Sequence, residues 1–191
     1  MSKMEVTREE AAFHEAGHGV AACFMKCAFD ALSIMDVGVF GGTMEINPER
    51  WARMPAFPAD GTGTGCSRGG SGNPVWKGLV RKRVICLLAG MYAECNYLIR
   101  TGYTPEDALA RAGAFGRPDC EEAEGLVRSW LELEGADLEA YMADSCQRAY
   151  DFTVDRSLEI GAVAQALLKA GKLSSKQVRA EIARYEEVPL A

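Results

Sequence analysis

The spacing of apolar and polar positions first predicts a helix over residues 6–28. This stretch is rich in alanine and contains no proline. Thr7 and Glu10 stand three residues apart near its start, which predicts a capping box with Thr7 as the N-cap. Apolar residues recur at helical spacing and are expected to face the core; they are Phe13, Val20, Ala21 and Phe24.

The pattern changes to a rough alternation of apolar and polar residues over 31–46. Gly41 and Gly42 interrupt the alternation, which resumes over 43–46, so we predict a short β-hairpin or pair of strands. An edge strand beside a catalytic site can accept an extended peptide as one more strand. An ordinary small sheet packed on the helix is the alternative, and the sequence leaves both open.

Residues 47–74 have no periodic pattern and carry four of the seven prolines, together with a Gly/Ser/Thr-rich tract over 61–72. The tract contains no lysine and follows no predicted strand, which argues against a phosphate-binding loop. We predict an irregular loop. A lid over an active site is the alternative, because long loops within a domain are often functional.

Helical spacing then dominates to the end of the chain. A second long helix is predicted over 75–100, and turn residues over 101–118 leave room for a short helix at 105–112. Asp119 is expected to act as the N-cap of a helix over 119–134. The C-terminal helical part, 135–191, is divided into helices over 137–155, 156–170 and 176–184, with Gly171 after the second of them. The expected fold is a single domain over 1–191, mainly α with a small β-hairpin or sheet.

Composition narrows the class of protein. The chain has 191 residues, of which 48% are hydrophobic, enough to build the core of one domain. It has no run of about 18 apolar residues that would predict a transmembrane helix, and its first ten residues lack the apolar centre of a signal peptide. We therefore expect a cytoplasmic protein with no membrane partner.

Charge and cysteine content exclude further classes. The net charge is −6, and the one basic cluster is Arg81-Lys82-Arg83, so nucleic-acid binding is not predicted. Seven cysteines are scattered without a C-x-x-C pair, which in a chain without a secretory signal indicates reduced thiols. Cys23 and Cys27 lie four residues apart and could bind a soft metal, but small buried apolar residues are the preferred interpretation.

The strongest chemical signal lies in the first helix, where His14-Glu15-Ala16-Gly17-His18 places two imidazoles four residues apart. Side chains at this spacing share one helix face, so both rings can reach one ion. The arrangement is the H-E-x-x-H motif of zinc metallopeptidases, in which the glutamate is the general base. These are the only two histidines of the chain. Gly17 and Gly19 lower helix propensity by about 1 kcal/mol each, which predicts close approach of another segment here.

A catalytic zinc ion takes three protein ligands and keeps one position open. Because the chain has no third histidine, the third ligand must be a Cys, Asp or Glu. Cys120 stands beside one candidate, Asp119. Glu94 lies on an otherwise apolar part of the second long helix, either as the partner of a ligating histidine or directed to solvent.

Taken together, several motifs resemble the peptidase domain of the FtsH family over nearly the whole chain. They are H-E-A-G-H at 14–18, the short β region, L-A-G-M-Y-A-E at 88–94, an Asp followed four residues later by Ala, and the stretch 158–178. The resemblance implies a helical FtsH peptidase-like fold, with Zn²⁺ held by His14, His18 and an Asp that opens a helix after the L-A-G helix.

Two aspartates compete for the third ligand position that the resemblance implies. Asp119 matches the expected place. Asp107 lies nearer to the L-A-G motif and follows a Thr-Gly pair, but three helix-breaking residues come soon after it: Gly113, Gly116 and Pro118. Because these would cut its helix short, Asp119 is the preferred ligand.

The FtsH family couples this domain to an AAA ATPase and a membrane anchor, whereas this sequence contains neither a Walker A string nor a transmembrane segment. The resemblance therefore implies an ATP-independent zinc metalloendopeptidase with Glu15 as its general base, acting on peptides or unfolded segments of proteins. A homo-oligomer and a separate unfoldase partner both remain open. The alternative function is a non-catalytic, metal-stabilised adaptor or interaction module on a peptidase fold.

Overall fold

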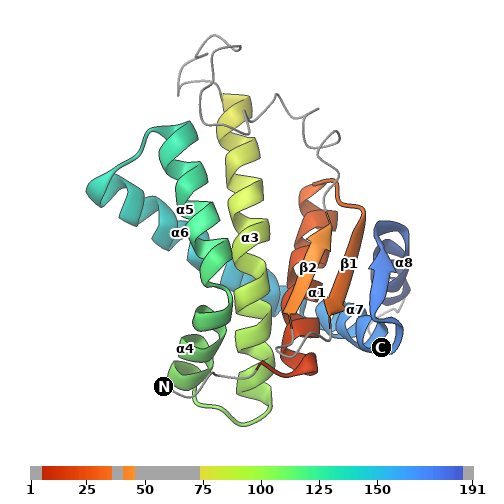
Figure 1. Ribbon diagram of the computed structural model, residues 1–191. Helices are drawn as coiled ribbons and strands as arrows, with labels where there is room; N and C mark the ends of the chain where they lie inside the picture. Colours follow the sequence, from red (N-terminus) through yellow and green to blue (C-terminus); the bar gives the residue numbers. More distant parts are fainter. Residues whose placement is uncertain (1–5, 36–40, 46–73, 187–191) are drawn as a thin grey trace.

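The computed structural model describes residues 6–35, 41–45 and 74–186, and shows a mainly helical fold with a small antiparallel sheet (Figure 1). The predicted loop over 47–74 lies outside these residues except for Pro74, which begins a helix, and the lid alternative lies outside them as well. In the described part of the chain, no helix is both long enough and apolar enough to cross a bilayer.

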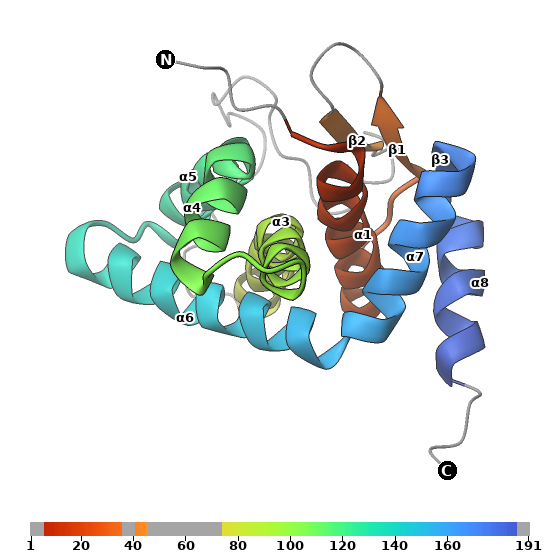
Figure 2. The same cartoon turned by 90° about the horizontal axis from the view of Figure 1, so that it is seen from below.

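Helix α1, Arg8–Met25, is the central element. The predicted capping box is confirmed: the Glu10 backbone N–H donates to Thr7 Oγ1 at 3.2 Å, and the Thr7 N–H donates to the Glu10 carboxylate at 2.5 Å. All residues of α1 from Glu10 to Ala22 are buried. Seen along α3, the helix α1 lies between α3 on one side and α7 on the other, beneath the sheet (Figure 2).

The glycines of α1 serve close packing, as predicted. A Cβ at Gly17 would lie 2.4 Å from the backbone oxygen of Ala89 on α3. A Cβ at Gly19 would lie 2.4 Å from Cδ1 of Leu32 on strand β1. Because real Cβ atoms do not approach other atoms so closely, α1 loses helix propensity at these two positions and in return packs directly on two neighbouring elements.

The sheet has three antiparallel strands in the order β2-β1-β3: β1 is Ala31–Met35, β2 is Gly41–Glu45 and β3 is Lys172–Ser174. The predicted pair of strands is confirmed. The predicted break at Gly41 and Gly42 is wrong, because both glycines lie inside β2 and pair with β1. Strand β3 was not expected, since three residues carry too little pattern and their partner strand lies far away in the sequence.

Helices α3, Pro74–Arg100, α4, Pro105–Phe115, and α5, Arg117–Leu131, form the second half of the core. Helix α4 continues through Gly113 to Phe115, beyond the predicted end at 112. Helix α5 begins two residues before its predicted start, so Asp119 is not the N-cap; Gly116 holds that position without a side-chain hydrogen bond. The Asp119 carboxylate is thereby free to turn away from its own helix.

The three C-terminal helices follow the prediction closely: α6 is Gly135–Asp155, α7 is Ser157–Ala170 and α8 is Ser175–Glu186. Gly171 ends α7 with φ 71°, the left-handed conformation that glycine adopts most easily. One apolar cluster joins α1, the sheet, α7 and α8, and another joins α3, α5 and α6. The interface between α1 and α3 lies where these two clusters meet.

Candidate metal centre

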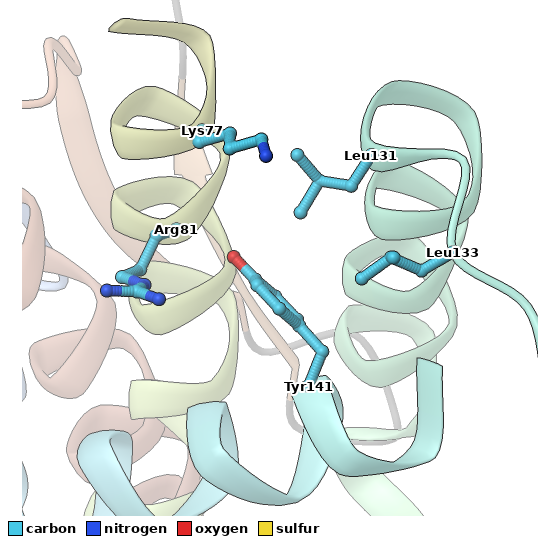
Figure 3. A pocket seen from close by; sticks show the side chains of 5 residues that line it. All are labelled: Lys77, Arg81, Leu131, Leu133 and Tyr141. Atoms are coloured by element: carbon cyan, nitrogen blue, oxygen red, sulfur yellow. The ribbon is translucent and has the colours of Figure 1, made fainter. Parts of the chain in front are cut away.

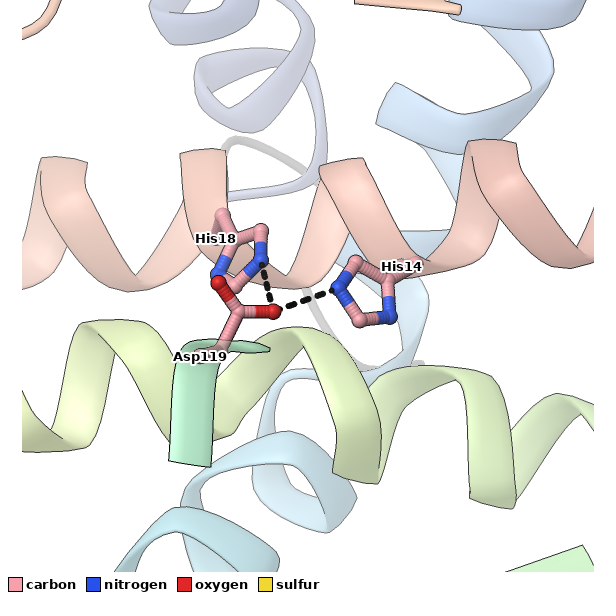
Figure 4. Close-up of side chains that lie close together, drawn as sticks. All are labelled: His14, His18 and Asp119. Carbon is pink, nitrogen blue, oxygen red and sulfur yellow. Dashed lines mark hydrogen bonds and ion pairs between the residues drawn. The ribbon is translucent and has the colours of Figure 1, made fainter. Parts of the chain in front are cut away.

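The two histidines of α1 and Asp119 of α5 converge on one point (Figure 4). One carboxylate oxygen, Asp119 Oδ2, lies 3.0 Å from His14 Nε2 and 3.5 Å from His18 Nε2. The three ligand atoms lie within 4.8 Å of one another, and both imidazoles are buried. His14, His18 and Asp119 therefore form a group that could hold a metal ion.

The local structure explains why Asp119 and not Asp107 reaches the histidines. Asp107 is exposed in the first turn of α4, where its carboxylate and its backbone N–H both bond to the hydroxyl of Thr104, the N-cap residue. Asp119 has no such local partner and faces α1. Its neighbour Cys120 is turned aside, with its sulfur 3.9 Å from the sulfur of Met91. Of the two candidate aspartates, the structure brings only Asp119 to the histidines.

Each imidazole is held from behind by a second hydrogen bond. His14 Nδ1 lies 3.0 Å from Oε2 of Glu94, whose side chain is fully buried, and His18 Nδ1 donates to the backbone oxygen of Cys86 at 2.8 Å. These bonds place hydrogen on Nδ1 and leave Nε2 to the shared point. The interpretation of Glu94 as the partner of a ligating histidine therefore agrees with its position, and the solvent-directed alternative is wrong. Cys86 contributes a backbone oxygen, for which the sequence carries no signal.

Gly90 of α3 provides the space for both imidazoles. A Cβ at this position would lie 2.5 Å from Cε1 and Nε2 of His18 and 2.9 Å from Nε2 of His14. On the opposite side, the Phe115 ring stands edge to face with His14 at a centroid distance of 4.7 Å. Gly90 in the L-A-G-M-Y-A-E motif thus allows α3 to pass directly beside the ligand atoms.

Glu15 lies between α1 and strand β2, next to the metal group. Its side chain is buried, and its Oε2 atom has no hydrogen-bond partner. A Cβ at Gly42 of β2 would lie 2.4 Å from Glu15 Oε1, so the glycine makes room for the carboxylate. An unpartnered buried carboxylate oxygen is costly for the fold, which points to a use in function. The role of Gly42 was missed in the sequence, where it was interpreted as a strand break.

The charges of the site favour protons at the positions where a metal ion would bind. Burial opposes protonation of His14, but hydrogen bonds to Asp119 and Glu94 outweigh it and raise its pKa to about 9. The His18 pKa is also raised, since the bond to Asp119 overcomes its burial. Burial favours the neutral form of Asp119, yet the two histidines hold its pKa well below the usual range. Protons and a metal ion therefore compete for the same nitrogen atoms.

Glu15 behaves differently from Asp119, although both are carboxylates near the same histidines. Burial raises the pKa of Glu15, and the attraction of His18 and His14 only partly offsets this effect. A carboxylate with a raised pKa accepts a proton more readily at neutral pH. The site therefore contains one carboxylate suited to binding a cation and another suited to accepting a proton.

The donor set of two imidazole nitrogens and one carboxylate oxygen suits zinc and other divalent transition metals. A separate hollow of about 150 Å³ lies between the start of α3 and the ends of α5 and α6, lined by Lys77, Arg81, Leu131, Leu133 and Tyr141 (Figure 3). This hollow contains neither an acid nor an imidazole. The metal group is therefore the better candidate for a chemical function.

Comparisons with known proteins do not assign the chain. No protein-family model matches it, and a search of curated proteins finds no similar sequence. A function must therefore be argued from the residues of the metal centre, their partners and their chemistry.

Proposed function

We propose that the chain is a zinc-dependent metalloendopeptidase of the FtsH peptidase type, which hydrolyses peptide bonds in peptides or unfolded segments of proteins. The observation that carries the proposal is the convergence of His14 Nε2, His18 Nε2 and Asp119 Oδ2 beside the buried, unpartnered Oε2 of Glu15. Two imidazoles and one carboxylate leave a position open on a four-coordinate zinc ion, as hydrolytic sites require.

The contact between the two motif segments supports the family assignment within this proposal. Gly90 of the L-A-G-M-Y-A-E segment faces both imidazoles of the H-E-A-G-H segment, and Glu94, four residues later, bonds to His14. One turn of α3 thus supplies both the space and the second hydrogen bond that the histidines need. The two motifs make sense together as parts of one metal site.

In the proposed mechanism, His14, His18 and Asp119 hold the zinc ion, while Glu94 and the Cys86 carbonyl fix the orientation of the two imidazoles. When bound, zinc supplies a Lewis acid that polarises the scissile carbonyl and makes a water molecule more acidic. Glu15 accepts the proton of the attacking water and passes it to the nitrogen of the leaving amine. Burial prepares Glu15 for both steps, because its raised pKa makes the carboxylate a better base and its acid form a usable donor.

Strand β2 offers a way to hold an extended substrate. Within the described residues β2 pairs only with β1, so it forms one edge of the sheet, and its Gly42 contacts Glu15. A peptide bound along this edge by backbone hydrogen bonds would pass close to the general base. Recognition through backbone groups accepts many sequences, which suits flexible or unfolded segments as substrates.

The test is a comparison of zinc-loaded parent protein with the Glu15→Gln variant, using casein as substrate with and without a chelator. We expect the parent protein to cleave casein and the chelator to stop it. Glu15→Gln should bind zinc as the parent does and cleave about 10²- to 10⁴-fold more slowly, because only the proton transfer is lost. Zinc content is measured by atomic emission on the same samples.

Glu9→Gln is the matched control, since Glu9 lies on the same helix but is exposed. It should leave both zinc content and cleavage unchanged. Cleavage by Glu15→Gln at the parent rate would contradict the assigned role of Glu15. Parent protein that binds zinc firmly but cleaves no peptide would instead favour the non-catalytic interaction module.

A further inference from the structure

Two cysteines meet behind the metal centre, one from each of the two main helices. Cys27 follows the C-cap of α1, and Cys86 lies on α3; both are buried, with 7% and 2% of their surface exposed. Their sulfur atoms are 3.9 Å apart, and the Cys86 thiol donates to the Cys27 sulfur. The backbone oxygen of the same Cys86 accepts the hydrogen bond from His18 Nδ1. The thiol pair is therefore directly linked to the support of one candidate metal ligand.

We infer that Cys27 and Cys86 form an oxidisable pair, which closes to a disulfide that fastens the end of α1 to α3 behind His18. A disulfide needs its sulfurs about 2.05 Å apart, so side-chain rotations must bring the two atoms closer by about 2 Å. The contact already aligns them without an intervening side chain. Oxidation would then fix α3 where it carries the carbonyl that orients His18.

The surroundings assign different roles to the two thiols. The pKa of Cys27 is lowered because the Cys86 thiol donates to its sulfur; burial opposes this shift, and the charges of Lys82 and Arg83 support it. The pKa of Cys86 is raised, first by its bond to Cys27 and then by burial. Thiolates are the form that attacks oxidants. Cys27 is therefore the attacking sulfur, and Cys86 is the sulfur that completes the bond.

The oxidant we propose is hydrogen peroxide, which is small enough to reach a nearly buried sulfur. The Cys27 thiolate attacks one peroxide oxygen, the O–O bond breaks and hydroxide leaves, so that Cys27 becomes a sulfenic acid. The Cys86 sulfur then displaces the oxygen from Cys27, forming the S–S bond, and its proton leaves with that oxygen as water. Two thiols have lost two electrons in total, and one peroxide molecule has been reduced to two waters.

The remaining cysteines within the described residues lack a comparable partner. Cys120 contacts the sulfur of Met91, which cannot form a disulfide. Cys23 lies one helical turn before Cys27, but its pKa is raised by burial, which disfavours its thiolate. The structure thus predicts one specific pairing among the many that seven cysteines allow.

The experiment treats the full zinc-loaded chain with a small excess of hydrogen peroxide, blocks free thiols and maps tryptic peptides without reduction. The expected product joins peptide 27–50 to peptide 84–100, with a loss of two hydrogens that a phosphine reductant reverses. Peptide 84–100 contains both Cys86 and Cys95, so the variants Cys86→Ala and Cys95→Ala decide between them. The joined peptide must disappear in Cys86→Ala and persist in Cys95→Ala.

A second measurement follows from the 59 residues that separate the two cysteines. Closing a loop of this length constrains the unfolded chain, so the oxidised protein should melt about 5–10 °C higher than the reduced protein. Cys27→Ala should show no such shift on oxidation. A disulfide involving any other cysteine, or over-oxidation of Cys27 without a cross-link, would overturn the inference. Peptide mapping requires no peptidase activity, so its outcome is independent of the proposed function.

Discussion

The crossing of α1 and α3 and the outer faces of α5 and α6 use polar side chains in opposite ways. At the crossing, His14, His18 and Glu94 are buried, and their partners lie on other elements. On the outer faces, pairs such as Glu124–Arg128 are exposed and join residues one helical turn apart. Solvent can replace a lost partner on the outer face but not at the crossing. Substitutions should therefore be costly in the first region and nearly neutral in the second.

The largest effect is expected from removing the carboxylate that completes the metal group. Asp119→Asn keeps the size of the side chain but removes its charge, so zinc affinity should fall by at least about 100-fold, more than for a typical change behind a ligand. Competition with a chromophoric zinc chelator measures the loss. Asp107→Asn is the matched control and should stay within a few-fold of the parent protein, because Asp107 is exposed on α4. Equal losses in both variants would remove the distinction between the two aspartates.

A smaller effect with an informative sign is expected from adding one methyl group to a helical glycine. Gly90→Ala places a Cβ 2.5 Å from the His18 ring, so the overpacked helix interface should lose about 1–3 kcal/mol of stability, and zinc should bind more weakly. Gly161→Ala on α7 meets no atom within 4 Å and should gain up to about 1 kcal/mol through helix propensity. Urea unfolding of both variants tests the opposite signs. Two changes of the same sign would show that the crossing tolerates a side chain.

The next prediction concerns the pH dependence of stability in the zinc-free protein. The His14 pKa of about 9 in the folded state exceeds the value of about 6.5 in the unfolded chain. Its stabilising contribution is therefore complete below about pH 6.5 and lost as the pH rises through 9. The raised pKa values of His18 and Glu15 act in the same direction.

The measurement is the urea midpoint of zinc-free and zinc-loaded protein between pH 6.5 and 9. The zinc-free midpoint should fall over this range. The zinc-loaded midpoint should fall less, because deprotonated imidazoles bind metal more tightly as protons become scarce. A flat profile for the zinc-free protein would mean that the imidazoles are not held in their protonated forms by Asp119 and Glu94.

The smallest effect is expected on the outer face of α5. Arg128→Ala removes an exposed pair with Glu124 and should change stability by less than about 0.5 kcal/mol, leaving zinc affinity unchanged. Thermal unfolding at low and moderate salt measures both the change and its screening. A loss as large as that of Gly90→Ala would show that the outer face contributes more than an exposed pair can explain.

The helical elements were predictable because their signals are local. The capping box at Thr7 and Glu10 and the glycine after α7 each involve residues within one helical turn, and both are confirmed. The errors in the fold occur where a partner from elsewhere decides. Gly42 lies inside a strand because β1 pairs with it, and β3 exists because β1 has a second free edge.

The candidate site divides along the same line. The i, i+4 spacing placed His14 and His18 on one face of a helix, and the choice of Asp119 over Asp107 agrees with the contacts that the structure shows. The reasoning behind that choice was partly wrong, because α4 continues through Gly113. Asp107 is kept from the histidines by its bond to Thr104 and its exposed position, not by an early end of its helix.

The sequence by itself determined which residues can ligate and accept protons, and that two of them share a helical face, because helix geometry fixes neighbours within a turn. Only the tertiary structure decided which carboxylate completes the group, which carbonyl holds His18 and that Cys27 meets Cys86. These contacts join residues 59 to 105 positions apart. Such contacts depend on how α1 packs against α3 and α5, and the glycines at 17 and 90 allow that approach only when a particular partner is present.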